Sequence, residues 1–365
     1  MSLEFAGRVR RIPSYPVAQT YEFGGDLVKL ASNETPFAPH PAVLEAVESV
    51  VRSLNRYPDP AKTALRRKIA DRLGVHAGAV AVGNGSCELL FAASDALLEP
   101  GAEVVYAWPS FSVYPQLAAQ SGARAVEVPL DAEYRHDLEA MAREVNVATR
   151  MVLVCNPNNP TGTAIPIDEI DRFVGSLPRR VAVLLDEAYV EFSTLQDPDD
   201  TLPLLKKHPN LVILRTFSKV YGLAGLRVGY AVGSEDFRVA VDTVRQPFSV
   251  SALALAGATE ALRHVDEVER RVERTAIERL HLEEALDERG LVHADSEANF
   301  SWVGLGDRDE DAVLDGLAKR GVIVRGGKAL GSAGFIRVTY GTRPENDRFL
   351  GALDEVLEEV PAGEG

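Results

Sequence analysis

The stretch "LVILRTFSKVYGLAGLR", residues 211–227, sets a lysine directly behind a run of apolar residues. A short and almost continuous apolar run of this kind is typical of a strand that is buried on both faces of a parallel sheet. Lys219 is one of only eight lysines in the 365 residues, and most of the others lie in polar surroundings. A lysine at the end of such a strand is either a residue of a solvated loop or an amine placed for chemistry.

The same alternation of short apolar runs and helical patterns extends over residues 41–245. Short strands separated by helices are the signature of an α/β domain with a largely parallel sheet. We therefore predict a large domain at 41–245, with a mostly parallel central sheet flanked by helices. After residue 245 a long charged helix and a few strands predict a small α+β domain at 246–361. We expect residues 1–40 to form an N-terminal arm that packs with the small domain.

The composition excludes several classes of function. A net charge of −15 and a pI near 5.0 argue against a nucleic-acid partner. The two cysteines, Cys87 and Cys155, are too few for a disulfide framework and predict reduced thiols in a cytoplasmic protein. We expect no membrane association, because no stretch is apolar and long enough to span a bilayer and the N-terminus lacks the pattern of a signal peptide. No metal ion is expected.

Two loops rich in glycine or asparagine follow predicted strands. In "VAVGNGSCELL", residues 80–90, a strand leads into Gly85 and Ser86, where a helix begins. The free N–H groups of a helix start bind anions such as phosphate, although a tight turn without a ligand is the simpler explanation of this motif alone. In "NPNNPTG", residues 156–162, prolines fix the backbone, so Asn156, Asn158 and Asn159 can point amides at a ligand. A generic turn is the alternative there.

Charged residues follow two further strands. Asp186 comes after five apolar residues, at the end of a strand where open α/β sheets bind ligands. A helix N-cap would explain Asp186 alone, but it does not explain Tyr189 in otherwise apolar surroundings. Partial burial and a nearby arginine lower the pKa of a lysine, so Lys219 close to Arg227 can be a nucleophile. Ser218 and Arg227 together suit a phosphate group.

The four strand ends therefore offer an anion cradle, an amide, a carboxylate with a tyrosine, and a lysine. Pyridoxal 5′-phosphate needs all four, for its phosphate, phenolic oxygen, ring nitrogen and aldehyde. The motifs "GNGSCELL", "NPNNPTG", "DEAYVEF" and "TFSKVYGLAGLRVGY", in this order, resemble those of fold-type I pyridoxal-phosphate aminotransferases. With "ASNETPFAP", "NRYPDP", "GVIVR" and "FIRVTYGTR", they are similar in particular to the histidinol-phosphate aminotransferase family over nearly the whole chain.

The resemblance implies a cofactor role for each matching residue. Lys219 would bond to the cofactor's aldehyde and later shuttle a proton, and Asp186 would pair with the protonated ring nitrogen. Asn159 and Tyr189 would hydrogen-bond to the phenolic oxygen, and Phe111 would stack on the ring. The phosphate would be held by Ser218, Arg227, the backbone at Gly85, Ser86 and Cys87, and Tyr57 from the second subunit of a homodimer. The family often has an acidic residue at the position of Cys87, so we expect only backbone contact there.

The resemblance also implies residues that bind substrate. Arg337 would bind the α-carboxylate of glutamate or 2-oxoglutarate, next to Asn159. Arg325 and Tyr15 would contact the phosphate of histidinol phosphate. Without the resemblance, an arginine in a strand more often reaches solvent or pairs with a carboxylate.

The leading prediction is a transaminase of histidine biosynthesis that moves an amino group between histidinol phosphate and 2-oxoglutarate. The alternative is an aromatic amino acid (phenylalanine) aminotransferase with the same mechanism, since "TFSKVYGLAGLR", "VRQPFSVSALA" and "ANFSWVGLG" also resemble the actinobacterial aromatic aminotransferases. Two other classes remain open. A cofactor-binding regulator would need a DNA-binding module, and the roughly forty residues before the first long helix are too few for one. A related lyase shares the fold but has less need of Arg337.

Overall fold

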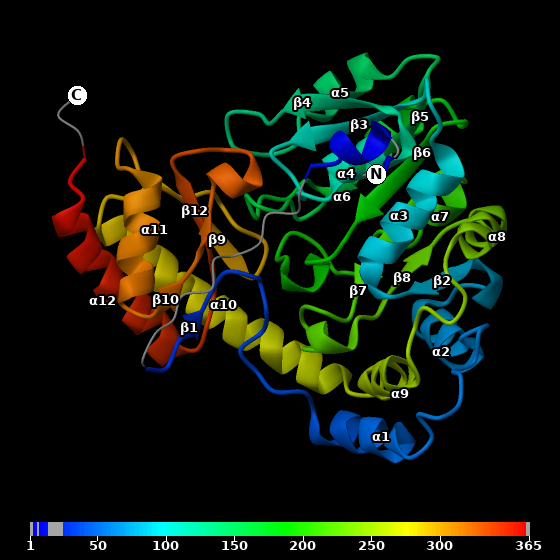
Figure 1. The fold of residues 1–365 in the computed structure, drawn as a ribbon, viewed down its shortest axis with the longest axis horizontal. Helices are drawn as coiled ribbons and strands as arrows, with labels where there is room; N and C mark the ends of the chain where they lie inside the picture. The colour runs from blue at the N-terminus through cyan, green and yellow to red at the C-terminus, as the bar shows by residue number, and fades with distance from the viewer. Residues whose placement is uncertain (1–2, 6, 14–24, 363–365) are drawn as a thin grey trace.

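A seven-stranded sheet forms the centre of the large domain, on the right in Figure 1. The structure, a computed structural model, describes residues 3–5, 7–13 and 25–362. The strand order is β2 (Val80–Gly83), β8 (Gly229–Val232), β7 (Leu211–Thr216), β6 (Ala182–Asp186), β5 (Thr149–Cys155), β3 (Glu103–Trp108) and β4 (Arg124–Pro129). Strands β3 to β7 pair in parallel, and β8 runs antiparallel to both of its neighbours. The predicted fold class is confirmed.

Helices cover both faces of this sheet, which explains why the middle positions of its central strands are apolar on both faces. Leu184 of β6 faces one side, with α3 (Gly85–Leu97), α4 (Tyr114–Ser121) and α8 (Glu235–Val244). Leu185 faces the other, with α5 (Leu138–Glu144), α6 (Ile167–Ser176) and α7 (Leu204–Lys207). Because successive residues of a strand point to opposite faces, a strand between two helical layers needs apolar residues on both faces along its middle.

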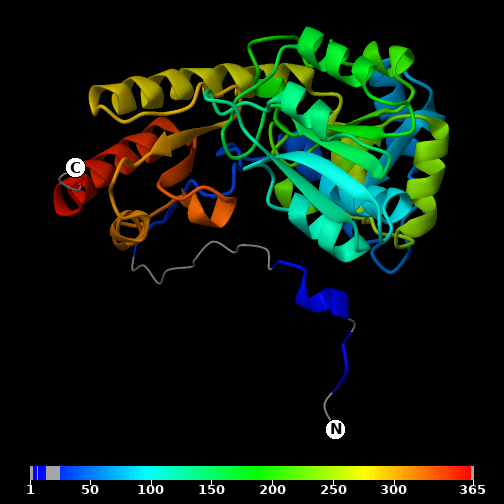
Figure 2. The ribbon, with the colours of Figure 1, turned by 90° about the horizontal axis from the view of Figure 1, so that it is seen from above.

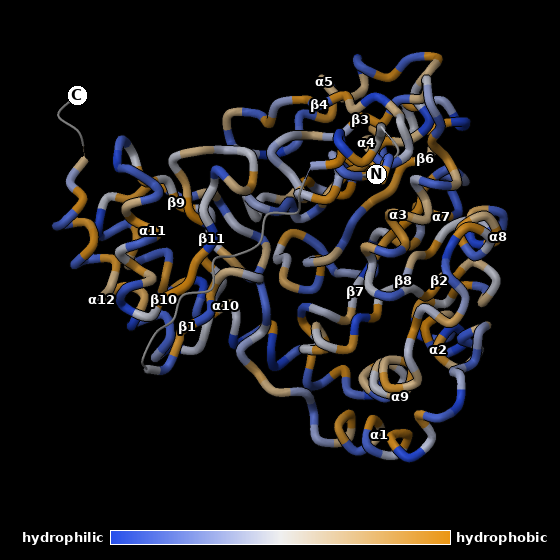
Figure 3. The backbone as a smooth tube through the Cα atoms, in the orientation of Figure 1, coloured by the Kyte–Doolittle hydropathy of each residue, from blue (hydrophilic) through white to orange (hydrophobic). Residues whose placement is uncertain are grey.

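A third cluster of helices covers the β2 and β8 edge of the sheet. It consists of α1 (Pro41–Val51), α2 (Thr63–Leu73) and α9 (Ala252–Ala261). Along α1, at the bottom of Figure 3, hydrophobic and hydrophilic residues alternate as expected of a helix with one buried face. The sequence prediction assigned residues 252–261 to the small domain, but their packing on α1 and α2 places this helix with the large one.

The small domain, orange and red in Figure 1, is an α+β unit. Its antiparallel sheet has the order β11 (Arg325–Gly326), β12 (Phe335–Thr339) and β9 (Phe300–Gly304), packed with α11 (Glu310–Lys319) and α12 (Arg343–Glu359). The long helix α10 (Val265–Glu288) runs from the large domain into the small one, as Figure 2 shows from above. Short 3-10 helices lie at Gly7–Arg10, Ala77–Ala79, Val190–Phe192, Ala224–Leu226 and Lys328–Leu330.

The described part of the N-terminal arm divides between the two domains. Strand β1 (Val28–Lys29) pairs in parallel with β10 (Val322–Ile323) of the small domain. Leu30 continues this pairing, because its N–H donates to Ile323 and its C=O accepts from Thr339 of β12. The 3-10 helix at Gly7–Arg10 instead approaches α4 of the large domain. Within the described ranges, no helix has the length and apolar character needed to cross a membrane.

Candidate functional site

The carboxyl ends of the central strands open into a cavity of about 580 Å³ between the two domains. Cys155, Asp186 and Thr216 end or nearly end β5, β6 and β7, and all three line it. The sheet therefore brings together the residues that the sequence placed at strand ends. The remaining lining comes from the start of α3, the loops after β3, β5, β6 and β7, the arm, and the small domain, and includes Ser86, Cys87, Phe111, Asn159, Tyr189, Ser218, Lys219, Arg227, Arg325 and Arg337.

The start of α3 lies at the cavity, where the sequence predicts an anion cradle. The side chain of Asn84 at the N-cap makes no capping hydrogen bond, so the first backbone N–H groups of the helix are open to a ligand. Two glycines make the necessary room. A Cβ atom on Gly85 would lie 2.5 Å from Arg227 Nη2, and one on Gly229 would lie 2.5 Å from Ser86 N. Arg227, in the left-handed conformation with φ 56°, donates from Nη1 to the hydroxyl of Ser218 at 3.2 Å.

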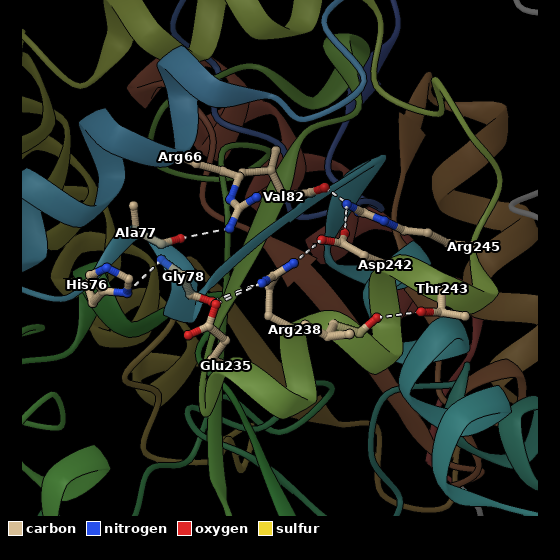
Figure 4. A network of polar contacts seen from close by, with 11 residues as sticks. Arg66, His76, Ala77, Gly78, Val82, Glu235, Arg238, Asp242, Thr243 and Arg245 are labelled. Atoms are coloured by element: carbon tan, nitrogen blue, oxygen red, sulfur yellow. Dashed lines mark hydrogen bonds and ion pairs between the residues drawn. The ribbon is translucent and has the colours of Figure 1, made fainter.

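A polar network behind the cradle fixes the strand that leads into it (Figure 4). Arg245 donates to the carbonyl oxygen of Val82 and to the carboxylate of Asp242. Arg238 donates to the carbonyl oxygen of Gly78 at 3.1 Å and to Asp242 at 3.3 Å. These contacts bind α8 to β2, so the turn at Gly85 starts from a fixed strand end.

Asp186 is buried and has one oxygen without a partner. Its Oδ2 accepts a hydrogen bond from the hydroxyl of Tyr114 at 3.3 Å, while Oδ1 has no partner among the described residues. Burial raises the pKa of Asp186 to about 6. A buried carboxylate is costly unless a cation or a strong donor faces it. The open oxygen therefore fits a ligand that carries a protonated nitrogen.

Lys219 lines the cavity, and its side chain reaches the arm. Its Nζ donates to the carbonyl oxygen of Ser32 at 3.0 Å and lies 5.5 Å from the ring centroid of Tyr189. Withdrawal from water, with a second contribution from the positive charge of Arg337, lowers the pKa of Lys219 to about 8. A larger fraction of neutral amine is thus present near neutral pH than on an ordinary lysine.

Asn159 and Tyr189 each form a hydrogen bond with another residue that lines the cavity. Arg337 donates from Nη1 to Oδ1 of Asn159, and from Nη2 to the carbonyl oxygen of Ala31 at 2.6 Å. The hydroxyl of Tyr189 accepts from the amide of Asn33 at 3.0 Å. The half-buried ring of Phe111 also lines the cavity.

The other two asparagines of the 156–162 loop do not reach the cavity, so that part of the sequence prediction was wrong. Asn156 closes a pair of hydrogen bonds with the backbone of Ile165. Asn158 accepts from Ser110 at 2.7 Å and from His136 at 3.0 Å, and it donates to Thr161 at 2.9 Å. Both asparagines shape the loop that presents Asn159.

The remaining predicted residues divide into three groups. Arg325 and Arg337 are partners across β11 and β12, and both line the cavity. Cys87 lines the cavity too, and burial raises the pKa of its thiol to about 11, so it is not a reactive thiolate. Tyr57 does not line the cavity. Its side chain is 83% exposed and stacks on the ring of Phe248. Tyr15 lies outside the described residues.

The sequence analysis missed the contribution of the arm. Ser32, Asn33 and Glu34 line the cavity, and two of them contact Lys219 and Tyr189. The only local signal was the polar group in "ASNETPFAP" directly after a short strand.

These features fit pyridoxal 5′-phosphate. The open helix start with Ser218 and Arg227 suits its phosphate, and the unpartnered oxygen of Asp186 suits its protonated ring nitrogen. Lys219, with its lowered pKa, suits its aldehyde. The donor set is therefore consistent with the cofactor expected from the sequence.

Comparisons with known proteins agree with this geometry. A family model described as "Aminotransferase class I and II" matches residues 25–353. The histidinol-phosphate aminotransferase of Geobacillus thermodenitrificans is 41% identical over 358 residues, which cover 96% of this chain and 98% of the relative. The aromatic amino acid aminotransferase of Cutibacterium acnes is 40% identical over 358 residues, covering 98% and 100%. The structure of histidinol-phosphate aminotransferase from Sinorhizobium meliloti in complex with pyridoxal-5′-phosphate superposes with a TM-score of 0.87 at 29% identity, covering 98% of this chain and 99% of that one.

Proposed function

The chain belongs to the class I and II aminotransferases, and from this premise we propose that it moves an amino group between histidinol phosphate and 2-oxoglutarate. It is a transaminase that uses pyridoxal 5′-phosphate. The substrate proposal rests on one observation, the pairing of Arg325 with Arg337 across β11 and β12. Directly opposite residues of an antiparallel pair point to the same face, so both guanidinium groups enter one cavity.

Two arginines suit a substrate pair that carries a carboxylate and a phosphate. Guanidinium groups bind both of these anions through two parallel hydrogen bonds. In the proposed arrangement Arg337 binds the α-carboxylate of glutamate or 2-oxoglutarate, next to Asn159. Arg325 binds the phosphate of histidinol phosphate, with Tyr15 as a further ligand.

The second candidate is transamination of aromatic amino acids such as phenylalanine. The relatives that carry the two names are equally similar to this chain, at 41% and 40% identity. The apolar side chains of Phe111 and Leu330 in the cavity wall would suit an aromatic ring. Arg337 would keep its role, whereas Arg325 would have no phosphate to bind.

The catalytic roles proposed for this chain follow from the site. When bound, pyridoxal 5′-phosphate supplies an aldehyde that takes up the amino group and a ring that accepts electrons from the substrate's α-carbon. Lys219 would hold the cofactor through that aldehyde, and its amine would be the group that moves the proton at the substrate's α-carbon. Asp186 would keep the ring nitrogen protonated through its open oxygen.

The other side chains bind and orient the cofactor. Asn159 and Tyr189 would hydrogen-bond to its phenolic oxygen, and Phe111 would pack on the ring. The first N–H groups of α3, at Gly85, Ser86 and Cys87, would bind its phosphate together with Ser218 and Arg227. These assignments are supported by the shared cavity and by the hydrogen bonds described above.

We further propose that the enzyme is a homodimer that works in the cytoplasm. In this proposal Tyr57, which does not line its own cavity, contacts the cofactor phosphate of a second subunit, and the exposure of its ring supports this role. The two cysteines are free thiols, which supports a reducing compartment.

The test compares two donors on the purified holoenzyme with 2-oxoglutarate as the acceptor. We expect a higher kcat/KM for histidinol phosphate than for phenylalanine. Arg325→Gln should lower kcat/KM for histidinol phosphate on the order of 10- to 100-fold and leave phenylalanine nearly unchanged. A preference for phenylalanine, with no selective effect of Arg325→Gln, would assign the enzyme to the aromatic alternative.

A further inference from the structure

Asn33 in the N-terminal arm connects the small domain to Tyr189. It is 1% exposed, and its backbone has the left-handed conformation with φ 54°. Its N–H donates to Thr339 Oγ1 at 2.9 Å, and its C=O accepts from the side chain of Asn299 at 3.1 Å. Its side chain accepts from Thr339 at 3.3 Å and donates to the hydroxyl of Tyr189 at 3.0 Å. All of its polar groups are engaged, and two neighbours belong to the small domain.

Each of these bonds has one direction in the structure. The backbone N–H of Asn33 can only donate, so Thr339 Oγ1 accepts from it. The hydroxyl hydrogen of Thr339 can then donate to Oδ1 of Asn33, which can only accept. This bond favours the observed orientation of the amide, with Oδ1 facing Thr339 and the NH₂ group facing Tyr189.

The consequence concerns the proton of Tyr189. Because the NH₂ group of Asn33 has no acceptor lone pair, the oxygen of Tyr189 must accept from it. The hydroxyl hydrogen of Tyr189 then remains for an acceptor in the cavity, which Tyr189 lines. An amide turned the other way would take up that hydrogen and leave the hydroxyl unable to donate to the cavity.

We propose that Asn33 is a positioning residue that fixes the direction of the Tyr189 hydroxyl, so that its proton faces an anionic oxygen of the bound cofactor, and that Thr339 of β12 imposes this direction. The inference rests on the proposed role of Tyr189 at the phenolic oxygen. Through Asn33, the small domain, which carries the arginines proposed to bind substrate, would influence the hydrogen bonding and therefore the electronic state of the cofactor.

The conformation of Asn33 limits the substitutions that can test this link. Asparagine and aspartate tolerate the left-handed region better than other residues with a side chain. Asn33→Asp is therefore nearly isosteric and keeps the backbone, but its carboxylate can only accept. The hydroxyl of Tyr189 would then turn and donate to residue 33.

The main experiment is a double-mutant cycle of Asn33→Asp with Tyr189→Phe in the full-length protein. The readouts are the affinity of each apo-protein for pyridoxal 5′-phosphate and the pH at which the absorbance of the bound cofactor changes. In the parent background, Asn33→Asp should weaken the affinity on the order of tenfold or more, and should raise the absorbance transition by about one pH unit. In the Tyr189→Phe background both effects should be much smaller, because no hydroxyl remains to turn and only the added charge still acts.

The cycle also separates the effect of turning the Tyr189 hydroxyl from the effect of the negative charge that aspartate introduces. A charge effect acts equally in both backgrounds, so equal losses in the two would overturn the proposal. No loss from Tyr189→Phe alone would also overturn it, by removing the role of the hydroxyl itself. Because neither readout uses an amino-acid substrate, a failure of the histidinol phosphate proposal would leave the result unaffected.

A second pair of variants tests the role of Thr339. Thr339→Val keeps the shape of the side chain but removes its oxygen, so the amide of Asn33 loses its fixed direction. We expect the same upward movement of the absorbance transition, smaller than for Asn33→Asp, and its rescue by Thr339→Ser. Equal behaviour of the valine and serine variants would show that Thr339 does not impose the direction.

Discussion

Arg337 of the small domain donates a hydrogen bond to Oδ1 of Asn159 in the large domain. A guanidinium group has no acceptor, so the amide oxygen of Asn159 must face Arg337 and its NH₂ group is left for the cavity. The residue proposed to bind the substrate carboxylate therefore also orients a donor for the cofactor. A substrate carboxylate would compete with Asn159 for Arg337, which couples substrate binding to the cofactor's hydrogen bonds.

Arg337→Lys should lower kcat/KM on the order of 10- to 100-fold, although the positive charge is kept. A lysine ammonium cannot donate hydrogen bonds to Asn159, to Ala31 and to a planar carboxylate with the fixed geometry of a guanidinium group. The measurement is steady-state kinetics with glutamate as the donor. The exposed Lys206 offers a neutral control as Lys206→Arg. If the Arg337→Lys protein had the same kcat/KM as the parent, Arg337 would not bind the substrate carboxylate through two parallel hydrogen bonds.

Lys219→Ala should lower turnover by at least about 10³-fold, because it removes both the nucleophile and the group that moves the proton. The fold should persist, since Lys219 makes a single hydrogen bond to the backbone of Ser32. Turnover is measured by coupled assay and the fold by circular dichroism, with Lys206→Ala as a matched surface control. Normal transamination by the Lys219→Ala protein would refute the assignment of the nucleophile.

The reactivity of Lys219 should depend on pH in a narrow range. Its pKa is lowered to about 8, so the free amine forms as the pH rises towards 8 rather than towards the usual lysine value of 10.5. The rate at which the apo-protein combines with pyridoxal 5′-phosphate, followed by absorbance, should rise with pH and level off above about 8. Because the charge of Arg337 contributes to the lowered pKa, Arg337→Leu should move the plateau to higher pH. A plateau near 10.5 in the parent would contradict this account.

Asp186 should make the apo-protein less stable as the pH rises. Its folded pKa of about 6 lies above the value of 3.8 for a free carboxyl, so the folded state holds the proton more tightly. The stability that this group contributes is complete below pH 3.8 and is lost as the pH rises through 6, by roughly 3 kcal/mol. Urea unfolding of apo Asp186→Asn should lack this loss, and the variant should be more stable than the parent at pH 7. Identical pH profiles would show that the carboxylate finds another partner.

His136 should have the opposite dependence. Burial lowers its pKa to about 4, below the ordinary value of 6.5, because the charged form is disfavoured away from water, and the hydrogen bond to Asn158 offsets this only in part. The corresponding stability is complete above pH 6.5 and is lost as the pH falls towards 4, by roughly 3 kcal/mol. His136→Gln, which keeps an N–H donor for Asn158, should unfold with a weaker dependence on acid. An unchanged acid transition would mean that protonation of His136 does not limit stability.

The fold of the large domain and the residues at its strand ends can be predicted from the amino-acid sequence. The apolar runs that end in Cys155 and Asp186, and the one that precedes Lys219, can only be strands buried on both faces, and parallel strands bring their carboxyl ends to one edge. The resemblance of the motifs then added the cofactor. These inferences succeed because they depend on the local periodicity of side chains, which the sequence states directly.

The tertiary structure alone decided which polar groups meet. The composition of the loop did not distinguish Asn159 from Asn156 and Asn158, and only the family resemblance selected it, because the folded shape of the loop is what turns one of the three into the cavity. Nor did the sequence place Asn33 against Tyr189, 156 residues away. It also assigned residues 252–261 to the small domain, although they pack on α1. Hydrogen bonds and helix packing between distant segments depend on how the elements assemble, and no periodic pattern in the chain encodes that assembly.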